Sequence, residues 1–113
     1  LTNRVATTDQ GPVEFNEHSR YRGKSKVMDY AGEISGRPAG IAICDHPNNL
    51  NHPSPWYVIR TNRMSYYSPA VICYAPHTLG PCQSFTLRYR VIVHRDKWSP
   101  ERLTREYERF VGE

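Results

Sequence analysis

The sequence predicts an all-β fold, a mostly antiparallel β-sandwich followed by one C-terminal α-helix. Short apolar or alternating segments recur along the chain, and nine prolines and seven glycines without a repeat separate them. No helical pattern lies between these segments, whereas parallel strands need long crossover connections. Only the C-terminal segment has a helical apolar pattern. With 113 residues, the chain is expected to be a single domain or the C-terminal part of a larger β-sandwich domain.

The strand predictions follow the chain in order. Residues 1–17 are mostly polar and are predicted to be an irregular lead-in, apart from a short strand at 12–15, and residues 18–23 are predicted to be a loop. The segments predicted as strands are 26–31, 39–44, 56–61, 70–74 and 84–94. The run AGIAIC at 39–44 is apolar throughout, which predicts burial on both faces. In the last strand, the predicted core face consists of Phe85, Leu87, Tyr89, Val91 and Val93.

Residues 99–111 carry the signals of a terminal helix. Ser99 is a suitable N-cap residue, and Pro100 occupies the first helical position, where its missing N–H costs nothing. Gly112 stands where a C′ glycine is expected. The predicted apolar stripe consists of Leu103, Tyr107, Phe110 and Val111.

The chain is basic, with a net charge of +4 and a pI of about 9.1, but its charges are mostly interspersed. The one basic cluster alternates with other residues, and its members are Arg20, Arg22, Lys24 and Lys26. On a strand, all four would share one face, which could attract a polyanion. The alternative is a solvated strand edge that charge protects from aggregation. We expect the solvated edge, and hence no nucleic-acid partner. No apolar run is long enough to span a membrane.

The termini and the cysteines give two further expectations. The chain begins with Leu1 and not with Met, so we expect it to be processed or to be a piece of something longer. Three cysteines are an odd number, and a disulfide framework is not expected. A single bridge between Cys73 and Cys82 across a hairpin stays open as an alternative, and Cys44 is expected to be a small buried hydrophobe.

The segment CDHPNNLNHPSPW at 44–56 is the candidate functional site. His46 and His52 each precede a proline, which favours extended backbone and a stiff loop. A carboxylate, imidazoles, amides and aromatic rings together suit a sugar, because rings cover its C–H face and polar groups bind its hydroxyls. We expect His46 or His52 to be the catalytic acid or base, oriented by Asp45. The expected substrate-binding residues are Asn48, Trp56, Tyr57 and Arg60.

Two other interpretations of this loop stay open. Asp45, His46 and His52 could imitate a two-histidine, one-carboxylate site for a transition metal, although no cofactor is otherwise predicted. Alternatively, the loop is only structural: the prolines stiffen it, Trp56 fills the core, and the histidines bind backbone carbonyls. No Gly-rich phosphate loop and no CxxC pair occurs in the sequence.

Four segments of the chain, read together, carry a resemblance to a known family. They are KVMDYAG at 26–32, GIAICDHPN at 40–48, HPSPWY at 52–57 and LRYRVIVH at 87–94. In this order they resemble the C-terminal part of an uncharacterised bacterial family labelled "methane oxygenase PmoA". The resemblance extends from about residue 18 to the end of the chain.

The resemblance implies an all-β sandwich enzyme or binding protein that handles carbohydrate and is periplasmic or secreted in preference to cytoplasmic. It also implies that an N-terminal portion, in the same protein or in another subunit, completes the domain. The label implies an alternative function, a copper- or iron-dependent oxidoreductase. A non-catalytic structural or interaction module is the third alternative.

Overall fold

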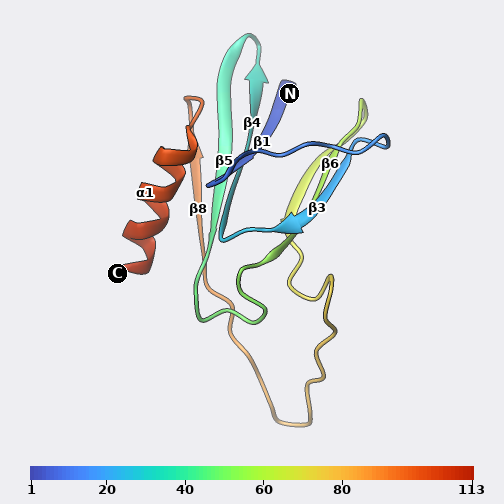
Figure 1. Ribbon diagram of the computed structural model, residues 1–113, viewed down its shortest axis with the longest axis vertical. Helices are drawn as coiled ribbons and strands as arrows, with labels where there is room; N and C mark the ends of the chain where they lie inside the picture. Colours follow the sequence, from blue (N-terminus) through green and yellow to red (C-terminus); the bar gives the residue numbers. More distant parts are fainter.

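The computed structural model describes residues 1–113 and confirms the predicted all-β fold class with one C-terminal helix (Figure 1). Every strand pair in it is antiparallel. The elements are β1 (Thr2–Thr8), β2 (Gly11–Pro12), β3 (Arg20–Lys24), β4 (Val27–Ile34), β5 (Arg37–Asp45), β6 (Pro55–Arg60), β7 (Ser65–Pro69), β8 (Tyr89–His94) and α1 (Pro100–Val111).

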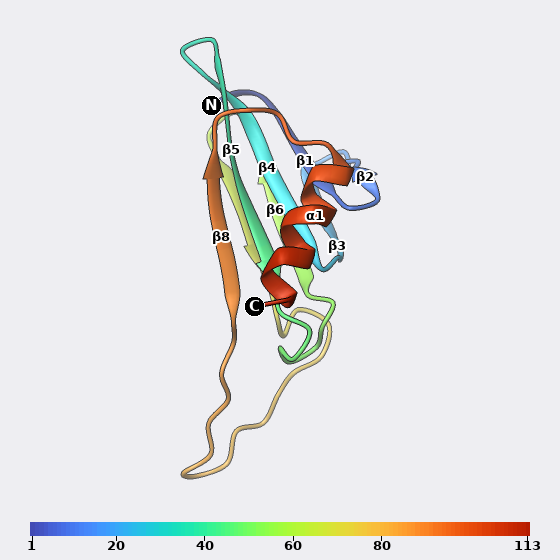
Figure 2. The same ribbon diagram turned by 90° about the vertical axis from the view of Figure 1, so that its left-hand side faces the viewer.

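The strands form two sheets that pack on one another. The larger sheet has five strands in the order β2-β1-β4-β5-β8, and the smaller sheet has the order β3-β6-β7. Figure 1 shows the smaller sheet and α1 on opposite sides of the larger sheet. Figure 2, turned to the helix side, shows α1 lying across the larger sheet. The molecule therefore has three layers, with the five-stranded sheet in the middle.

An aromatic core fills the space between the two sheets. It contains Ala6, Met28, Tyr30, Trp56 and Val58. The Trp56 ring stacks on Tyr67 of β7, with the ring centroids 5.9 Å apart. Its Nε1–H donates to the carbonyl of Ser25 at 2.8 Å, so the one polar atom of the buried indole is satisfied. Trp56 thus joins β6, β7 and the β3–β4 connection in one packed unit.

A second core lies between the larger sheet and α1. It contains Val27, Ala42, Cys44, Leu103, Tyr107 and Phe110. The predicted N-cap is confirmed, because the Ser99 side chain accepts the backbone N–H of Arg102 at 3.2 Å. Two details of the helix prediction are wrong. Val111 is exposed, and Gly112 has a φ of −77°, so it does not form the left-handed C′ cap.

The predicted irregular lead-in at 1–17 is wrong for its first half. Thr2–Thr8 form strand β1, which pairs with β4, and Ala6, Thr7 and Thr8 are buried. The polarity of the segment comes mainly from its threonines. Threonine is β-branched, and such residues suit a strand once a neighbouring strand provides backbone hydrogen bonds. The loop predicted at 18–23 is also corrected, because most of it belongs to β3.

The strand predicted at 70–74 does not form. β7 pairs with β6 from Ser65 to Pro69, and Pro69 lies opposite Trp56, with only Pro55 left at the start of β6. The N–H of Ala70 donates to the carbonyl of Pro55 at 2.7 Å, and backbone beyond Ala70 has no partner strand. Residues 70–88 instead form a long connection without strands, which extends away from the sheets in Figure 1.

The predicted core face of the last strand is wrong. Phe85 and Leu87 lie in the connection, and the side chains of Val91 and Val93 are 59% and 76% exposed. In the β5–β8 ladder, Val93 pairs with Ile41, which is also exposed, so the run at 39–44 is not buried on both faces. These residues face away from α1, on the side where the smaller sheet covers β1 and β4. The three-stranded sheet leaves this part of β5 and β8 uncovered.

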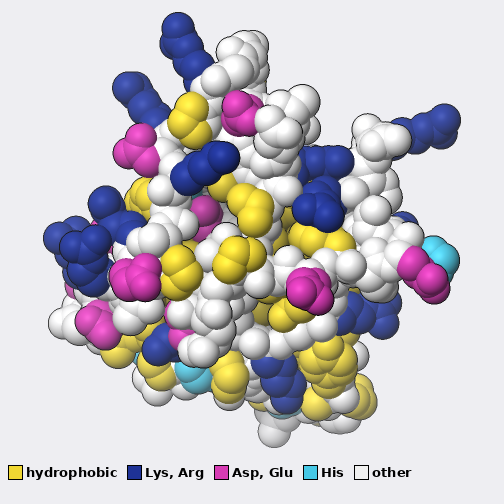
Figure 3. Space-filling view, turned by 45° about the horizontal axis from the view of Figure 1, so that its top comes forward, with side chains coloured by type: hydrophobic (Ala, Val, Ile, Leu, Met, Phe, Trp, Pro, Cys, Tyr) yellow, Lys and Arg dark blue, Asp and Glu magenta, His cyan; other side chains and the backbone are white.

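Charges are distributed over the surface. On the face drawn in Figure 3, lysine and arginine side chains lie at several separate places among acidic and apolar ones. No helix of the protein is long and apolar enough to cross a membrane. The three cysteines are free: Cys44 is buried, and Cys73 and Cys82 are exposed in the connection 70–88.

Candidate functional site

A buried carboxylate lies at the end of β5. Asp45 is only 1% exposed, and its backbone N–H donates to the carbonyl of Lys26 at 2.9 Å, which fixes the residue at the edge of the sheet. Its Oδ1 accepts a hydrogen bond from Asn49 Nδ2 at 2.7 Å, and its Oδ2 accepts the backbone N–H of Ser54 at 3.0 Å. These donors hold the carboxylate in one orientation, with Oδ2 directed at His52.

His52 completes a carboxylate–imidazole pair. Its Nδ1 lies 2.5 Å from Asp45 Oδ2, and its side chain is 22% exposed. When the imidazole is neutral, this contact assigns the proton to Nδ1, so that Nε2 carries the lone pair. Nε2 makes no hydrogen bond within the chain. The pair therefore combines a buried, oriented carboxylate with a partly exposed base.

A cavity of about 240 Å³ opens in front of His52. It is lined by Lys24, Asn51, His52, Pro55, Tyr74 and Ala75. The Lys24 ammonium lies 5.7 Å from the centroid of the Tyr74 ring. Asn51 donates from Nδ2 to the carbonyl of Val71 at 2.7 Å, which ties the loop 46–54 to the connection that carries Tyr74. The lining thus offers an imidazole, an ammonium, an amide and an aromatic ring.

Asn49 anchors the loop that carries His52. Its Nδ2 donates to Asp45 and to the carbonyl of Arg88, both at 2.7 Å, and its Oδ1 accepts the backbone N–H of Arg88 at 2.7 Å. Turn bonds from Asn49 N–H to His46 and from His52 N–H to Asn49 shape the chain between them. The His52–Pro53 peptide is cis. One buried amide thus connects the end of β5, the loop and the start of β8.

His46 does not join the pair. Its Nδ1 accepts the backbone N–H of Asn48 at 3.1 Å, its Nε2 lies 3.2 Å from Arg88 Nη1, and its ring meets the edge of Phe110 of α1. Adjacent residues leave a strand on opposite faces, which separates His46 from the cavity. The expectation of His46 as the acid or base is therefore not supported, and its ring packs between the loop and the helix.

The expected metal trio is likewise not assembled. Asp45 and His52 converge, but His46 points to the helix and has a guanidinium at its free nitrogen. A cation at that position opposes binding of a metal ion. No group of three or more His, Cys, Asp or Glu side chains in the chain gathers in a metal-holding arrangement.

The structure corrects the expected role of Trp56. Its side chain is fully buried between the sheets, so neither face of the indole is open to a sugar ring. The neighbouring Tyr57 points outward, where Arg20 Nε donates to its hydroxyl at 3.1 Å and the Arg22 guanidinium lies 4.9 Å from its ring centroid.

Arg60 and Asn48 lie apart from the cavity. Arg60 donates to the carbonyl of Arg4 at 3.1 Å and lies over the ring of Phe15. Asn48 is exposed on the loop, and its backbone N–H bonds to His46. Neither residue lines the cavity in front of His52.

Four residues of the site were not among the predicted ones: Lys24, Asn49, Asn51 and Tyr74. Lys24 belongs to the alternating basic cluster, and Tyr74 is the last residue of the segment 70–74 that was predicted as a strand. Only the fold brings them together, because β3 pairs with β6 and places Lys24 opposite Pro55. Asn49 lies inside the predicted loop, but nothing in the sequence distinguishes it from Asn48.

No activated nucleophile accompanies the pair. Burial raises the pKa of the Cys44 thiol to about 11, and the thiol lies in the core under α1. Ser54 is fully buried, and its hydroxyl donates to the carbonyl of Pro55 at 2.9 Å. The arrangement therefore supports general acid–base chemistry on a bound hydroxyl, water or C–H group, with His52 Nε2 as the proton acceptor.

A second buried pair, Asp29 and His94, has no cavity in front of it. Asp29 Oδ1 lies 2.6 Å from His94 Nε2, and His94 Nδ1 lies 2.6 Å from the carbonyl of Asp96. Trp98 stacks on the imidazole at 4.0 Å between ring centroids. Both ring nitrogens are occupied and the ring is covered, so this pair ties β4 to β8 and does not present a reactive atom.

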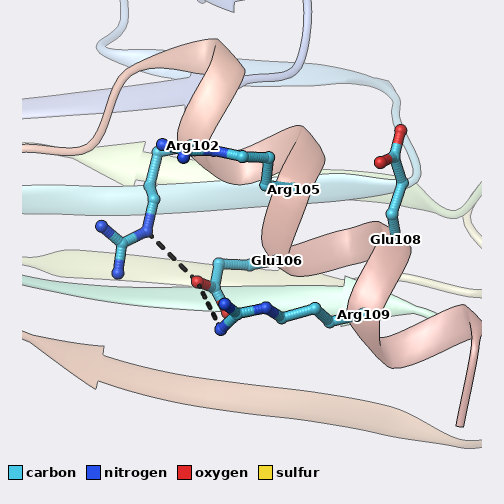
Figure 4. A pocket seen from close by; sticks show the side chains of 5 residues that line it. All are labelled: Arg102, Arg105, Glu106, Glu108 and Arg109. Atoms are coloured by element: carbon cyan, nitrogen blue, oxygen red, sulfur yellow. Dashed lines mark hydrogen bonds and ion pairs between the residues drawn. The ribbon is translucent and has the colours of Figure 1, made fainter.

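Other hollows lie on the surface, and one of about 590 Å³ is lined by Glu14, Phe15, Asn16, Arg20, Tyr21 and Arg22. One of about 280 Å³ lies over the uncovered face of β5 and contains mainly apolar side chains, among them Ile41, Tyr67 and Val93. Another is an open surface on α1, where Glu106 lies between Arg102 and Arg109 (Figure 4). Arg102 and Arg109 pair there with Glu106, whereas Arg105 and Glu108 form no ion pair.

Comparison with protein families now adds one finding. Residues 2–108 match the model of a family of unknown function, DUF6807. The chain belongs to this family. The matched range contains both sheets, Asp45, His52 and the greater part of α1. No curated protein and no solved structure matches the chain.

Proposed function

We propose that this DUF6807 chain binds a carbohydrate in the cavity in front of His52 and acts on it by acid–base chemistry. The observation that carries the proposal is the contact of 2.5 Å between His52 Nδ1 and the buried Asp45 Oδ2, which leaves Nε2 directed away from its partner. Such a pair fixes the tautomer of a base and stabilises the imidazolium that forms when the base takes a proton.

The cavity lining favours a polar, ring-shaped ligand. Tyr74 offers a half-exposed aromatic ring, and Asn51 and Lys24 offer hydrogen-bonding groups around it. This is the combination of ring and polar partners that recognises a sugar. In the proposal, Tyr74 takes the stacking role that was expected of Trp56, and Asp45 acts as a positioning residue for His52.

A screen of oligosaccharides for binding and turnover tests this function. The wild type is compared with His52→Ala and with His18→Ala, in which an exposed histidine on the β2–β3 connection is removed. We expect turnover of at least one oligosaccharide to fall by about 10²–10⁴-fold in His52→Ala and to be unchanged in His18→Ala. Equal turnover by His52→Ala and the wild type would contradict the proposal, as would a wild type that binds no oligosaccharide.

A further inference from the structure

Strand β3 presents a row of cations beside the proposed site. Arg20, Arg22 and Lys24 are alternate residues of β3, so their side chains leave the same face of the smaller sheet. Arg22 pairs across the ladder with Tyr57, and Lys24 pairs with Pro55. We call Arg20, Arg22 and Lys24 the β3 basic face. Lys26, which was expected to extend it, follows the end of β3 and lies over the ring of Tyr107 instead.

The β3 basic face has a carboxylate nearby, because Glu14 lines the same hollow as Arg20 and Arg22. None of its three cations forms an ion pair with a carboxylate, whereas other basic side chains do: Lys26 pairs with Asp9, Arg90 with Glu113, and two helix arginines with Glu106. The contrast with α1 is visible in Figure 4, where Glu106 lies between its arginine partners. The β3 cations contact aromatic rings or phenol oxygens: Arg20 and Arg22 meet Tyr57, and Lys24 meets Tyr74.

One of these cations lies inside the proposed site. Lys24 and His52 line the same cavity, and Arg22 stands two residues before Lys24 on the strand, which is about 6.7 Å along it. A ligand that occupies the cavity and continues along β3 therefore meets two unpaired cations in succession.

We propose that the carbohydrate is acidic: an oligosaccharide whose sugar carboxylates lie at Lys24 and Arg22. This inference rests on the proposed function and specifies its substrate class. A neutral sugar needs no cation, whereas a guanidinium and an ammonium each bind a carboxylate through charge-assisted hydrogen bonds. Arg22 stays beside the path because the Tyr57 ring supports its guanidinium.

The same face suits a nucleic acid less well. Non-specific binding of a polynucleotide rests on many phosphate contacts and on open aromatic rings that stack with bases. The β3 basic face has three cations, and Arg22 already lies over the Tyr57 ring. The remaining basic residues lie on other elements, several of them on α1 at the opposite side of the larger sheet (Figure 1).

Isothermal titration calorimetry with three probes tests the substrate class. The probes are an oligogalacturonate, a neutral galactose oligosaccharide of the same length, and a single-stranded oligonucleotide of the same charge. The variants are Arg22→Glu/Lys24→Glu and a control, Arg95→Glu/Lys97→Glu. The control changes an Arg and a Lys at the same spacing in the exposed β8–α1 connection and alters the net charge equally. Circular dichroism confirms that each variant is folded.

We expect the wild type to bind the oligogalacturonate more tightly than the neutral oligosaccharide. Arg22→Glu/Lys24→Glu should weaken this binding by about tenfold or more, and the control by less than about twofold. Equal binding of both oligosaccharides, unaffected by Arg22→Glu/Lys24→Glu, would overturn the acidic substrate and leave the proposed function standing. No binding of either oligosaccharide would overturn both. Tighter binding of the oligonucleotide, lost in Arg22→Glu/Lys24→Glu, would overturn the acidic sugar in favour of nucleic acid.

Discussion

The Nδ1 atom of His52 lies 2.5 Å from Oδ2 of Asp45, although a stiff loop separates the two residues in the sequence. Asp45 ends strand β5, and His52 returns to it through turns that Asn49 holds in place. The contact gives the protein one imidazole with a defined tautomer at the edge of a cavity. The proposed chemistry depends on this relationship.

Replacement of Asp45 by Asn should reverse the tautomer of His52. An Asn side chain can donate its amide N–H to Nδ1, which then becomes the acceptor and leaves the proton on Nε2. The ¹⁵N chemical shifts of the His52 ring, measured with selectively labelled histidine, report which nitrogen is protonated. We expect protonated Nδ1 in the wild type and protonated Nε2 in Asp45→Asn. Turnover should fall by about 10²–10⁴-fold. An unchanged tautomer would show that Asp45 does not orient His52.

Asn49 and Asn48 form a matched pair for testing the loop. Asn49 is buried with three side-chain hydrogen bonds, whereas Asn48 is exposed. Asn49→Ala leaves the Arg88 N–H without its partner and the Arg88 C=O with only the His46 N–H, so we expect the free energy of unfolding to fall by about 1–3 kcal/mol. Asn48→Ala should change it by less than about 0.5 kcal/mol. Urea denaturation measures both, and similar values for the two variants would contradict the anchoring role of Asn49.

The three cysteines should differ sharply in reactivity. Cys73 and Cys82 are exposed and free, whereas burial raises the pKa of the Cys44 thiol to about 11. Because only the thiolate reacts readily, a thiol reagent at about pH 8 should label two cysteines per chain quickly and the third only after unfolding. Mass spectrometry of the labelled peptides identifies the sites. Fast labelling of Cys44 in the folded protein would show that α1 does not cover it as described.

The buried Asp29–His94 pair predicts a defined pH dependence of stability. Burial raises the pKa of Asp29 above its ordinary value of 3.8, although the hydrogen bond and charge of His94 oppose the shift. The folded protein therefore binds the Asp29 proton more tightly than the unfolded chain does. The stability that Asp29 contributes is fully present below that ordinary value and is lost as pH rises through the raised pKa.

Asp29→Asn removes this titration and can still donate a hydrogen bond to His94. We therefore expect the difference in unfolding free energy, wild type minus Asp29→Asn, to decrease as pH rises from about 3 to about 7. Urea denaturation at a series of pH values measures it. A difference that increases with pH would indicate that Asp29 is held as a stabilised carboxylate.

The sequence predicted the fold class because the relevant signals are local. Prolines, glycines and apolar alternation mark short strands, and Ser99-Pro100 marks the start of the one helix. It did not predict which face of a strand is covered. Val91 and Val93 share a face, as their alternation requires, but the smaller sheet ends before it reaches them. Whether Val91 and Val93 are covered depends on how many strands each sheet has. β1 was missed for a similar reason, because β4 supplies its partner from a distant part of the chain.

The candidate site, like the fold, was predicted from the sequence only in part. Loop composition identified Asp45 and His52, which the fold brings into contact, and their catalytic roles stay a prediction. Histidine and tryptophan are common in binding sites, but here His46 faces the helix and Trp56 faces the core. Adjacent residues of a strand point in opposite directions, and a single sequence does not show which direction leads to solvent. Lys24 and Tyr74 reach the cavity only through the pairing of β3 and the course of the connection 70–88.

The most direct test of the central claim compares the two histidines of the loop. Turnover of the oligosaccharide that the wild type processes best is measured for His52→Ala and His46→Ala, with rates corrected for the folded fraction. The account predicts a loss of about 10²–10⁴-fold for His52→Ala, because the proton acceptor is gone. For His46→Ala it predicts lower stability but a corrected rate close to that of the wild type, because His46 only packs against Phe110 and the loop. A large loss in His46→Ala with normal turnover in His52→Ala would contradict the account.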